Sequence, residues 1–241
     1  MNESKTNGAP MTAIETLDEL FQPFARSDLP GLVVGVAQRG KTVYRRGLGL
    51  ASVELGVANT PWTRMRIGSS SKHFTCLAAL LLAEEGRLDL DVDVRRYLPE
   101  LPELDGERTL RQMMTHSSGL RDYLDLSFIV GGLAVRPKGL ALPAQVRQSE
   151  ANFPAGEKML YCNGGYHLLS IAIARASGMP FEAFMKQRIF APLGMTNTDC
   201  APSDLEIQRG MATLHVPLPP ALGGGYRRGI FPPRRSRARG R

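Results

Sequence analysis

Residues 68–85 read GSSSKHFTCLAALLLAEE, and the rest of the chain is best understood from this stretch outward. From Thr75 to Glu85 the side chains favour a helix, and Gly86 is a typical residue to end it. Because this helix is apolar on nearly all sides, we expect it to be central and buried. Ser69 and Lys72 precede it three residues apart, so both face one side of its first turn if the helix begins near Ser69.

Ser69 and Lys72 have the spacing of a nucleophile and its base. A serine hydroxyl is a weak nucleophile, and a neighbouring lysine activates it only where burial destabilises the ammonium. The N-terminus of the following helix adds N–H groups that favour an oxyanion. The alternative is structural, since a serine-rich helix cap followed by a solvated lysine has the same pattern.

Two further segments carry candidate functional residues. Tyr161 and Asn163 open a second apolar helix, where a tyrosine can relay protons and an asparagine amide can hold a carbonyl or the lysine. The structural alternative is that Asn163 caps the helix while Tyr161 packs nearby. His116 lies in the segment THSSGL, residues 115–120, where it is either a general base or a residue that hydrogen-bonds the backbone of a turn.

The remaining pattern combines a short β segment with a long helical one. We predict a helix at 13–24, strands at 32–37 and 42–50 joined by a turn at 39–41, helices at 109–114, 164–176 and 180–190, and a loop at 217–225. This order indicates an α+β or mixed fold with a helical domain. An isolated hairpin is marginal in water, so the sheet needs further strands.

Composition narrows the classes of partner. The 241 residues are 43% hydrophobic and 22% charged, with no apolar run long enough for a membrane span. The chain has 30 basic and 23 acidic residues, and seven of the basic residues are arginines between positions 227 and 241. Without these seven, the basic and acidic residues are equal in number, so the rest of the chain is neutral. We therefore expect neither a nucleic-acid nor a membrane partner.

The start of the chain lacks the apolar core of a secretory signal, so we expect a cytoplasmic protein as written, or a periplasmic one if a signal was lost.

The motifs together resemble those of the serine β-lactamase-like hydrolases. Residues 67–75 (IGSSSKHFT) resemble the nucleophile segment, 161–166 (YCNGGY) the Y-x-N motif, 114–120 (MTHSSGL) the landmark between them, and 189–195 (IFAPLGM) a helix end. The family includes class C β-lactamases, D-alanyl-D-alanine carboxypeptidases, D-aminopeptidases and related esterases, and its members are penicillin-binding protein-like. Within the family, residues 118–123 (SGLRDY) and 161–164 (YCNG) look most like the D-aminopeptidase branch.

The resemblance implies a fold, a reaction and a set of roles. The fold is α+β of the β-lactamase/transpeptidase type, in which a helical domain packs on an antiparallel sheet. Ser69 attacks the substrate carbonyl to form an acyl-enzyme, Lys72 helps to take its proton, and Tyr161 acts as acid and base with Lys72. Asn163 orients the substrate or the lysine, while His116 and Gly119 are structural residues near the site. The substrate is a small amide, short peptide or ester, D-configured residues included, and neither a metal nor an organic cofactor is implied.

The sequence departs from the family near its C-terminal end. The third family motif (Lys or His, then Ser or Thr, then Gly) has no match, because no lysine or histidine is followed two places later by glycine. In the family the strand carrying it supplies one N–H of the oxyanion hole, and losing such a donor costs about 3 kcal/mol of transition-state stabilisation. We therefore expect a truncated chain: an incomplete domain over 11–232 (helix and hairpin at 11–68, mostly helical part at 69–200), then a basic disordered tail over 233–241.

The missing motif leaves alternatives to a working hydrolase. One is a catalytically impaired or non-enzymatic family member that binds peptidoglycan-like ligands. Another is a nucleic-acid-binding protein that acts through its arginine tail, which the neutral body of the chain and the absence of aromatic residues among the arginines disfavour.

Overall fold

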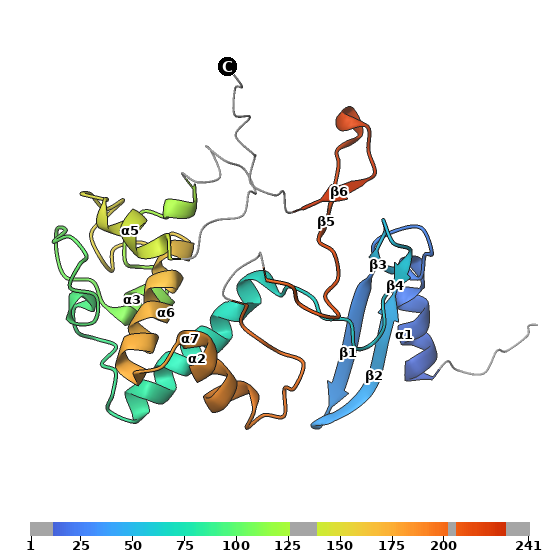
Figure 1. Ribbon diagram of the computed structural model, residues 1–241, viewed down its shortest axis with the longest axis horizontal. Helices are drawn as coiled ribbons and strands as arrows, with labels where there is room; N and C mark the ends of the chain where they lie inside the picture. The colour runs from blue at the N-terminus through green and yellow to red at the C-terminus, as the bar shows by residue number, and fades with distance from the viewer. Residues whose placement is uncertain (1–11, 126–138, 202–205, 230–241) are drawn as a thin grey trace, which may run out of the picture. The chain divides into compact units, whose positions relative to one another are not determined.

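The computed structural model describes residues 12–125, 139–201 and 206–229 (Figure 1). The chain forms two compact units. The first consists of the residues up to Arg66 together with Arg209–Arg228, and the second runs from Ile67 to Gln208. The sequence does not predict the membership of Arg209–Arg228 in the first unit. The expected tail at 233–241 lies outside the described residues.

The first unit opens with helix α1 (Ala13–Phe21). Its N-terminus is a capping box, in which Thr12 Oγ1 accepts from the N–H of Glu15 at 3.3 Å and the Glu15 carboxylate accepts from the N–H of Thr12 at 2.7 Å. A 3-10 turn at Gln22–Phe24 continues it. The predicted helix over 13–24 is therefore confirmed, with a tightened last turn.

Strands β1 (Leu32–Gln38) and β2 (Lys41–Leu48) form the predicted antiparallel hairpin. The two connecting residues, Arg39 and Gly40, have φ values of 51° and 76°. Positive φ at both positions is what a type I′ turn requires, and its twist matches that of the strands. The hairpin register contains one β-bulge, between Val36 and Ala37.

The second predicted strand ends earlier than expected, because Gly49 has φ 64° and approaches the backbone of Gly31. The chain resumes as β3 (Leu50–Ser52), which pairs with β4 (Val57–Ala58).

The predicted loop at 217–225 is flanked by a third antiparallel pair, β5 (His215–Pro217) and β6 (Tyr226–Arg228), and contains a 3-10 turn at Pro220–Leu222. Among the described residues the strands pair only two by two.

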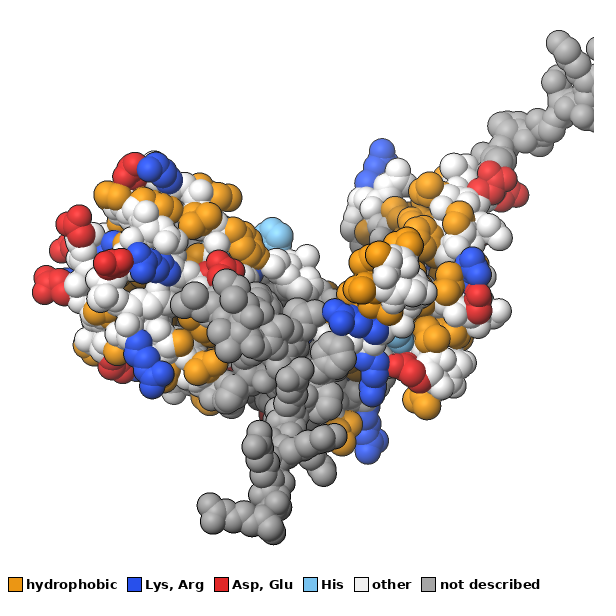
Figure 2. Space-filling view, turned by 90° about the horizontal axis from the view of Figure 1, so that it is seen from above, with side chains coloured by type: hydrophobic (Ala, Val, Ile, Leu, Met, Phe, Trp, Pro, Cys, Tyr) orange, Lys and Arg blue, Asp and Glu red, His pale blue; other side chains and the backbone are white. Residues whose placement is uncertain are grey.

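The first unit exposes much apolar surface. Helix α1 has no buried residue, and Figure 2 shows hydrophobic side chains gathered over the unit that contains α1 and β1–β4. Its large exposed hydrophobic side chains before Arg66 are Ile14, Leu20, Phe24, Val43, Leu55, Val57 and Trp62. The buried residues of this unit are few, because two-stranded sheets offer little area to pack against.

The core of the second unit is the packing of α2 (Ser71–Glu84) against α6 (Asn163–Ser177), which lie side by side in Figure 1. The fully buried residues of the two helices are Ala78, Ala79, Leu82, Leu168, Leu169, Ala172 and Ile173. Burying each larger aliphatic side chain contributes about 1.5–3 kcal/mol. The prediction of a central helix is confirmed, although Leu77 and Leu80 on its other side stay exposed.

Shorter helices complete the second unit: α3 (Leu110–Met114), α5 (Ala141–Val146) and α7 (Phe181–Met185). The predicted helix over 180–190 is confirmed in extent, but α7 passes into a π-helical segment at Lys186–Phe190. There the N–H of Ala191 donates to the carbonyl of Lys186, the wider spacing of a π turn. Helix α5 was not predicted from the sequence.

In the part of the chain that the structure describes, no single helix has the length and apolar composition to cross a membrane. Helix α6 and the helical segment Phe181–Phe190 are long and apolar enough only when they are taken together, and the two are bent by 77° relative to each other.

Candidate active site

All the described candidate site residues belong to the second unit, and α2 positions the first two of them. A 3-10 turn, Gly68–Ser70, leads directly to Ser71, where α2 begins. Ser69 is therefore exposed at the entrance of the helix, while Lys72 is half-buried in its first turn. Lys72 Nζ donates a hydrogen bond of 3.1 Å to Ser69 Oγ. The two side chains therefore meet as predicted, although Ser69 lies in the 3-10 turn just before α2 and not on the first turn of the α-helix.

Tyr161 reaches the same hydroxyl from the chain just before α6. Its phenolic oxygen lies 2.5 Å from Ser69 Oγ, although the two residues are 92 positions apart in the sequence. Partial burial raises the pKa of Tyr161. Hydrogen bonds with Lys72 and Ser69 and the positive charge of Lys72 lower it by more than burial raises it, so the pKa lies below the ordinary value. The Tyr161 hydroxyl therefore loses its proton more readily than an ordinary tyrosine does.

Asn163 is the first residue of α6, and its Oδ1 accepts a hydrogen bond of 2.9 Å from Lys72 Nζ. The side chain therefore faces the lysine. The helix cap is instead Cys162, whose Sγ accepts from the N–H of Gly165 at 3.3 Å. The alternative in which Asn163 serves as the cap is wrong.

Aromatic rings surround the lysine. Lys72 Nζ lies 4.8 Å from the ring centre of Tyr161 and 5.3 Å from that of Tyr166. Tyr166 is held in place because its hydroxyl donates to the carbonyl of Met114 at 2.7 Å and contacts Cys76 Sγ at 3.2 Å. Both rings direct their negative faces toward the ammonium and so help to hold it next to Ser69.

His116 holds the segment that carries Tyr161. Its carbonyl accepts from the N–H of Leu160 at 2.9 Å, and its Nδ1 accepts from the N–H of Cys162 at 3.1 Å. The imidazole lies against the Tyr161 ring with centroids 4.4 Å apart. Burial and the charge of Lys72 lower the pKa of His116, which keeps Nδ1 free to accept. Of the two interpretations of His116, the geometry matches the one in which it hydrogen-bonds the backbone.

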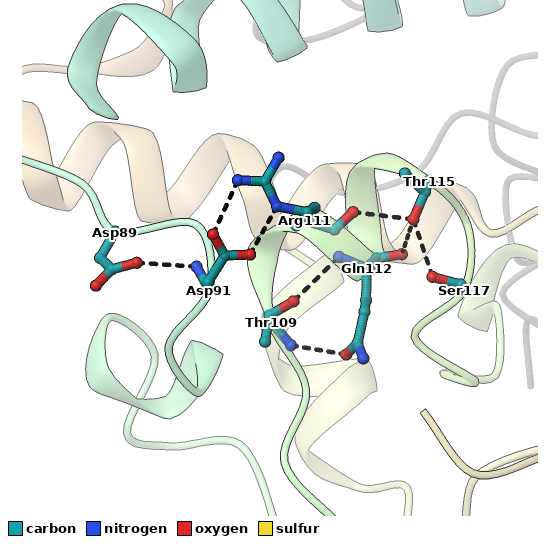
Figure 3. Close-up of polar contacts among 7 residues, drawn as sticks. All are labelled: Asp89, Asp91, Thr109, Arg111, Gln112, Thr115 and Ser117. Atoms are coloured by element: carbon teal, nitrogen blue, oxygen red, sulfur yellow. Dashed lines mark hydrogen bonds and ion pairs between the residues drawn. The ribbon is translucent and has the colours of Figure 1, made fainter. Parts of the chain in front are cut away.

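The turn around His116 is anchored by α3. Figure 3 shows the capping box of α3, in which Thr109 Oγ1 accepts from the N–H of Gln112 and Gln112 Oε1 accepts from the N–H of Thr109. Arg111 on the same helix makes a bidentate ion pair with Asp91. These contacts fix the end of α3, from which the turn leaves toward the site.

Gly119 closes this turn. Its φ is 70°, and a Cβ at this position would lie 2.1 Å from the carbonyl oxygen of Phe153. Both the backbone conformation and the space therefore exclude a larger residue.

Asp122 is a site residue that the sequence analysis did not single out. Its carboxylate is buried, and it accepts hydrogen bonds from the backbone N–H groups of Asn163 and Gly164 and from Asn163 Nδ2. It lies within residues 118–123, which resembled the D-aminopeptidase branch, but nothing in the spacing connects it with a helix 41 residues further on.

The arrangement is suited to acyl transfer. One hydroxyl, Ser69 Oγ, contacts both an ammonium and a phenol. The Asn163 amide accepts from that ammonium, and the Asp122 carboxylate accepts from the amide. Across the described ranges no group of three or more histidine, cysteine or acidic side chains is arranged to hold a metal ion.

Comparison with known proteins bears on this arrangement. The family model described as "Beta-lactamase" matches residues 17–231. A D-aminopeptidase of Brucella canis is 34% identical over 178 residues, which are 72% of this chain and 33% of the relative. The chain therefore spans 33% of the length of the curated relatives it matches first.

Solved structures of similar fold point the same way. The octameric penicillin-binding protein homologue from Pyrococcus abyssi is 28% identical, with a TM-score of 0.70 over 89% of this chain and 49% of that chain. The D-amino acid amidase from Ochrobactrum anthropi SV3, complexed with L-phenylalanine amide, is 26% identical, with a TM-score of 0.64 over 76% of this chain and 51% of that chain. These findings confirm both the resemblance and the predicted α+β fold of the β-lactamase/transpeptidase type. Since the family model covers most of the sequence, the chain belongs to the beta-lactamase family of serine β-lactamase-like hydrolases.

Proposed function

We propose that this protein is a serine hydrolase that cleaves small amides or short peptides through an acyl-enzyme on Ser69. The observation that carries the proposal is the pair of contacts to Ser69 Oγ, from Lys72 Nζ at 3.1 Å and from the Tyr161 hydroxyl at 2.5 Å. A serine needs a neighbouring base to become a nucleophile, and this hydroxyl has two candidates within hydrogen-bond reach.

The contact of the Tyr161 hydroxyl with Ser69 Oγ, together with its lowered pKa, supports a role for Tyr161 in the proton transfers. As Ser69 Oγ bonds to the substrate carbonyl carbon, its proton passes to the Tyr161 oxygen, whose negative charge Lys72 stabilises. Tyr161 then protonates the leaving amine as the carbon–nitrogen bond breaks. In the second half of the reaction a water molecule attacks the acyl carbon, its proton returns by the same route, and Ser69 is released with its hydroxyl restored.

The location of Ser69 also favours the developing negative charge. It lies at the entrance of α2, a helix of 14 residues, where the macrodipole is positive. This fixed dipole favours the oxyanion of a tetrahedral intermediate without the reorganisation that water would require.

The substrate class is proposed from the relatives. The D-aminopeptidase of Brucella canis and the D-amino acid amidase of Ochrobactrum anthropi both carry names that denote D-configured amides or peptides. We therefore propose D-amino acid amides and short peptides that contain a D-residue as the substrates of this protein.

The experiment is covalent labelling of the full chain by a fluorescent penicillin and by an activated ester, followed by mass spectrometry of the labelled peptide. We expect one adduct on Ser69, its loss in Ser69→Ala, and its retention in the matched control Ser70→Ala, which alters the neighbouring exposed hydroxyl. An adduct on any other residue would refute the role of Ser69. Saturable binding of the same probes without an adduct would favour the non-catalytic alternative.

A further inference from the structure

The buried carboxylate of Asp122 uses both of its oxygens on the start of α6. Oδ2 accepts from the backbone N–H of Asn163 at 2.6 Å and from Asn163 Nδ2 at 3.0 Å. Oδ1 accepts from the N–H of Gly164 at 3.0 Å and from the N–H of Leu124 at 3.0 Å. The side chain is 7% exposed, and charge-assisted hydrogen bonds of this kind compensate for its burial.

These contacts determine which way the Asn163 amide points. A primary amide has one end that donates and one that accepts, whereas a carboxylate only accepts and an ammonium only donates. With Asp122 on one side, Nδ2 must turn toward the carboxylate. Oδ1 is then left for Lys72 Nζ, which it meets at 2.9 Å. The orientation is therefore imposed from both sides, because the reversed amide would bring two donors together at Lys72 and two acceptors together at Asp122.

We propose that Asp122 is a positioning residue for the acylation reaction, acting on Lys72 through Asn163. This inference rests on the function proposed above. Asp122 presets the amide so that Oδ1 holds the ammonium within reach of Ser69 Oγ.

The replacement Asp122→Asn isolates this role, because it preserves size while placing an amide nitrogen against N–H donors. If the new nitrogen lies where Oδ2 lay, turning the Asn163 amide over removes its own clash and leaves its nitrogen facing Lys72, whereas the backbone N–H of Asn163 cannot turn away. Because a small misplacement in a catalytic group costs about 100-fold in rate, we expect the acylation rate to fall about 100-fold. The matched control is Asp125→Asn, which removes the same charge from an exposed position three residues away and should leave the rate unchanged.

A double-mutant cycle separates positioning from general support of the fold. If Asp122 acts through Asn163, Asp122→Asn should slow acylation little further in a chain that already carries Asn163→Ala. Multiplying rate losses in the double variant would overturn the proposal, because they would show that the two residues act independently.

A measurement on the unaltered chain needs neither a variant at Asp122 nor any activity. The side-chain amide protons of Asn163, assigned by NMR through their loss in Asn163→Ala, should exchange with solvent far more slowly than those of the exposed Asn152 and Asn197. Equal exchange rates would overturn the inference. If the unaltered chain forms no adduct, the proposed hydrolase function fails, while the exchange rates still decide whether Asp122 orients Asn163.

Discussion

Replacement of His116 by alanine tests whether this residue holds the segment of Tyr161. The change leaves the buried N–H of Cys162 without its acceptor, which costs about 1–3 kcal/mol. It also removes the ring packed on Tyr161 at 4.4 Å, worth about 0.5–1.5 kcal/mol. The positive φ of 59° at position 116 strains histidine and alanine alike, so it does not contribute to the difference in stability between the two chains. We expect His116→Ala to destabilise the second unit by about 2–4 kcal/mol.

The matched control is His116→Asn. Its Oδ1 stands at the same distance from the backbone as Nδ1 and is able to accept from Cys162, and asparagine tolerates a left-handed conformation better than other side chains. Only the ring contact with Tyr161 is then lost, so we expect a cost of about 1 kcal/mol.

The assay is urea unfolding followed by far-UV circular dichroism, because the helices lie mostly in the second unit while the single tryptophan, Trp62, lies in the first. The same variants are compared in the labelling reaction of Ser69. Equal stability of His116→Ala and the unaltered chain would refute the reasoning, and so would equal stability of the alanine and asparagine variants.

Acid should weaken the contribution of His116. Burial and the charge of Lys72 lower its pKa in the folded state below the value of 6.5, so between these two pKa values the unfolded chain binds more protons. The stability contributed by neutral His116 is complete above pH 6.5 and is lost as the pH falls toward the folded-state pKa. The stability difference between the unaltered chain and His116→Asn should therefore narrow below pH 6.5, and a widening difference would contradict this account.

Three further replacements have definite expected outcomes. Gly119→Ala should destabilise the chain by more than about 1 kcal/mol in urea unfolding, because the new Cβ would lie 2.1 Å from the Phe153 carbonyl oxygen at a φ of 70°. Tyr161→Phe should slow labelling of Ser69 about 100-fold or more while leaving circular dichroism unchanged, since it removes the proton carrier; an unchanged rate would exclude that role. Thr109→Ala should cost about 1 kcal/mol through loss of the α3 cap, measured by the same unfolding assay.

The sequence by itself determined the features that depend on near neighbours. The three-residue spacing of Ser69 and Lys72 at the start of a helix, the helix predicted at 109–114 and the hairpin turn at Arg39 and Gly40 are all local. Their energies come from groups a few residues apart, so the pattern of the residues is sufficient to predict them. Resemblance then added the roles of Tyr161 and Asn163, which no spacing rule supplies.

Tertiary structure alone decided how distant groups meet at Ser69. Tyr161 and Asn163 reach Ser69 and Lys72 across more than 90 positions because α2 packs on α6, and Asp122 reaches Asn163 across 41. The direction of an amide and the acceptor of an imidazole are set by which donors packing places beside them. The sequence names the groups that take part, but their partners follow from the burial of side chains between two helices that meet only in the folded chain.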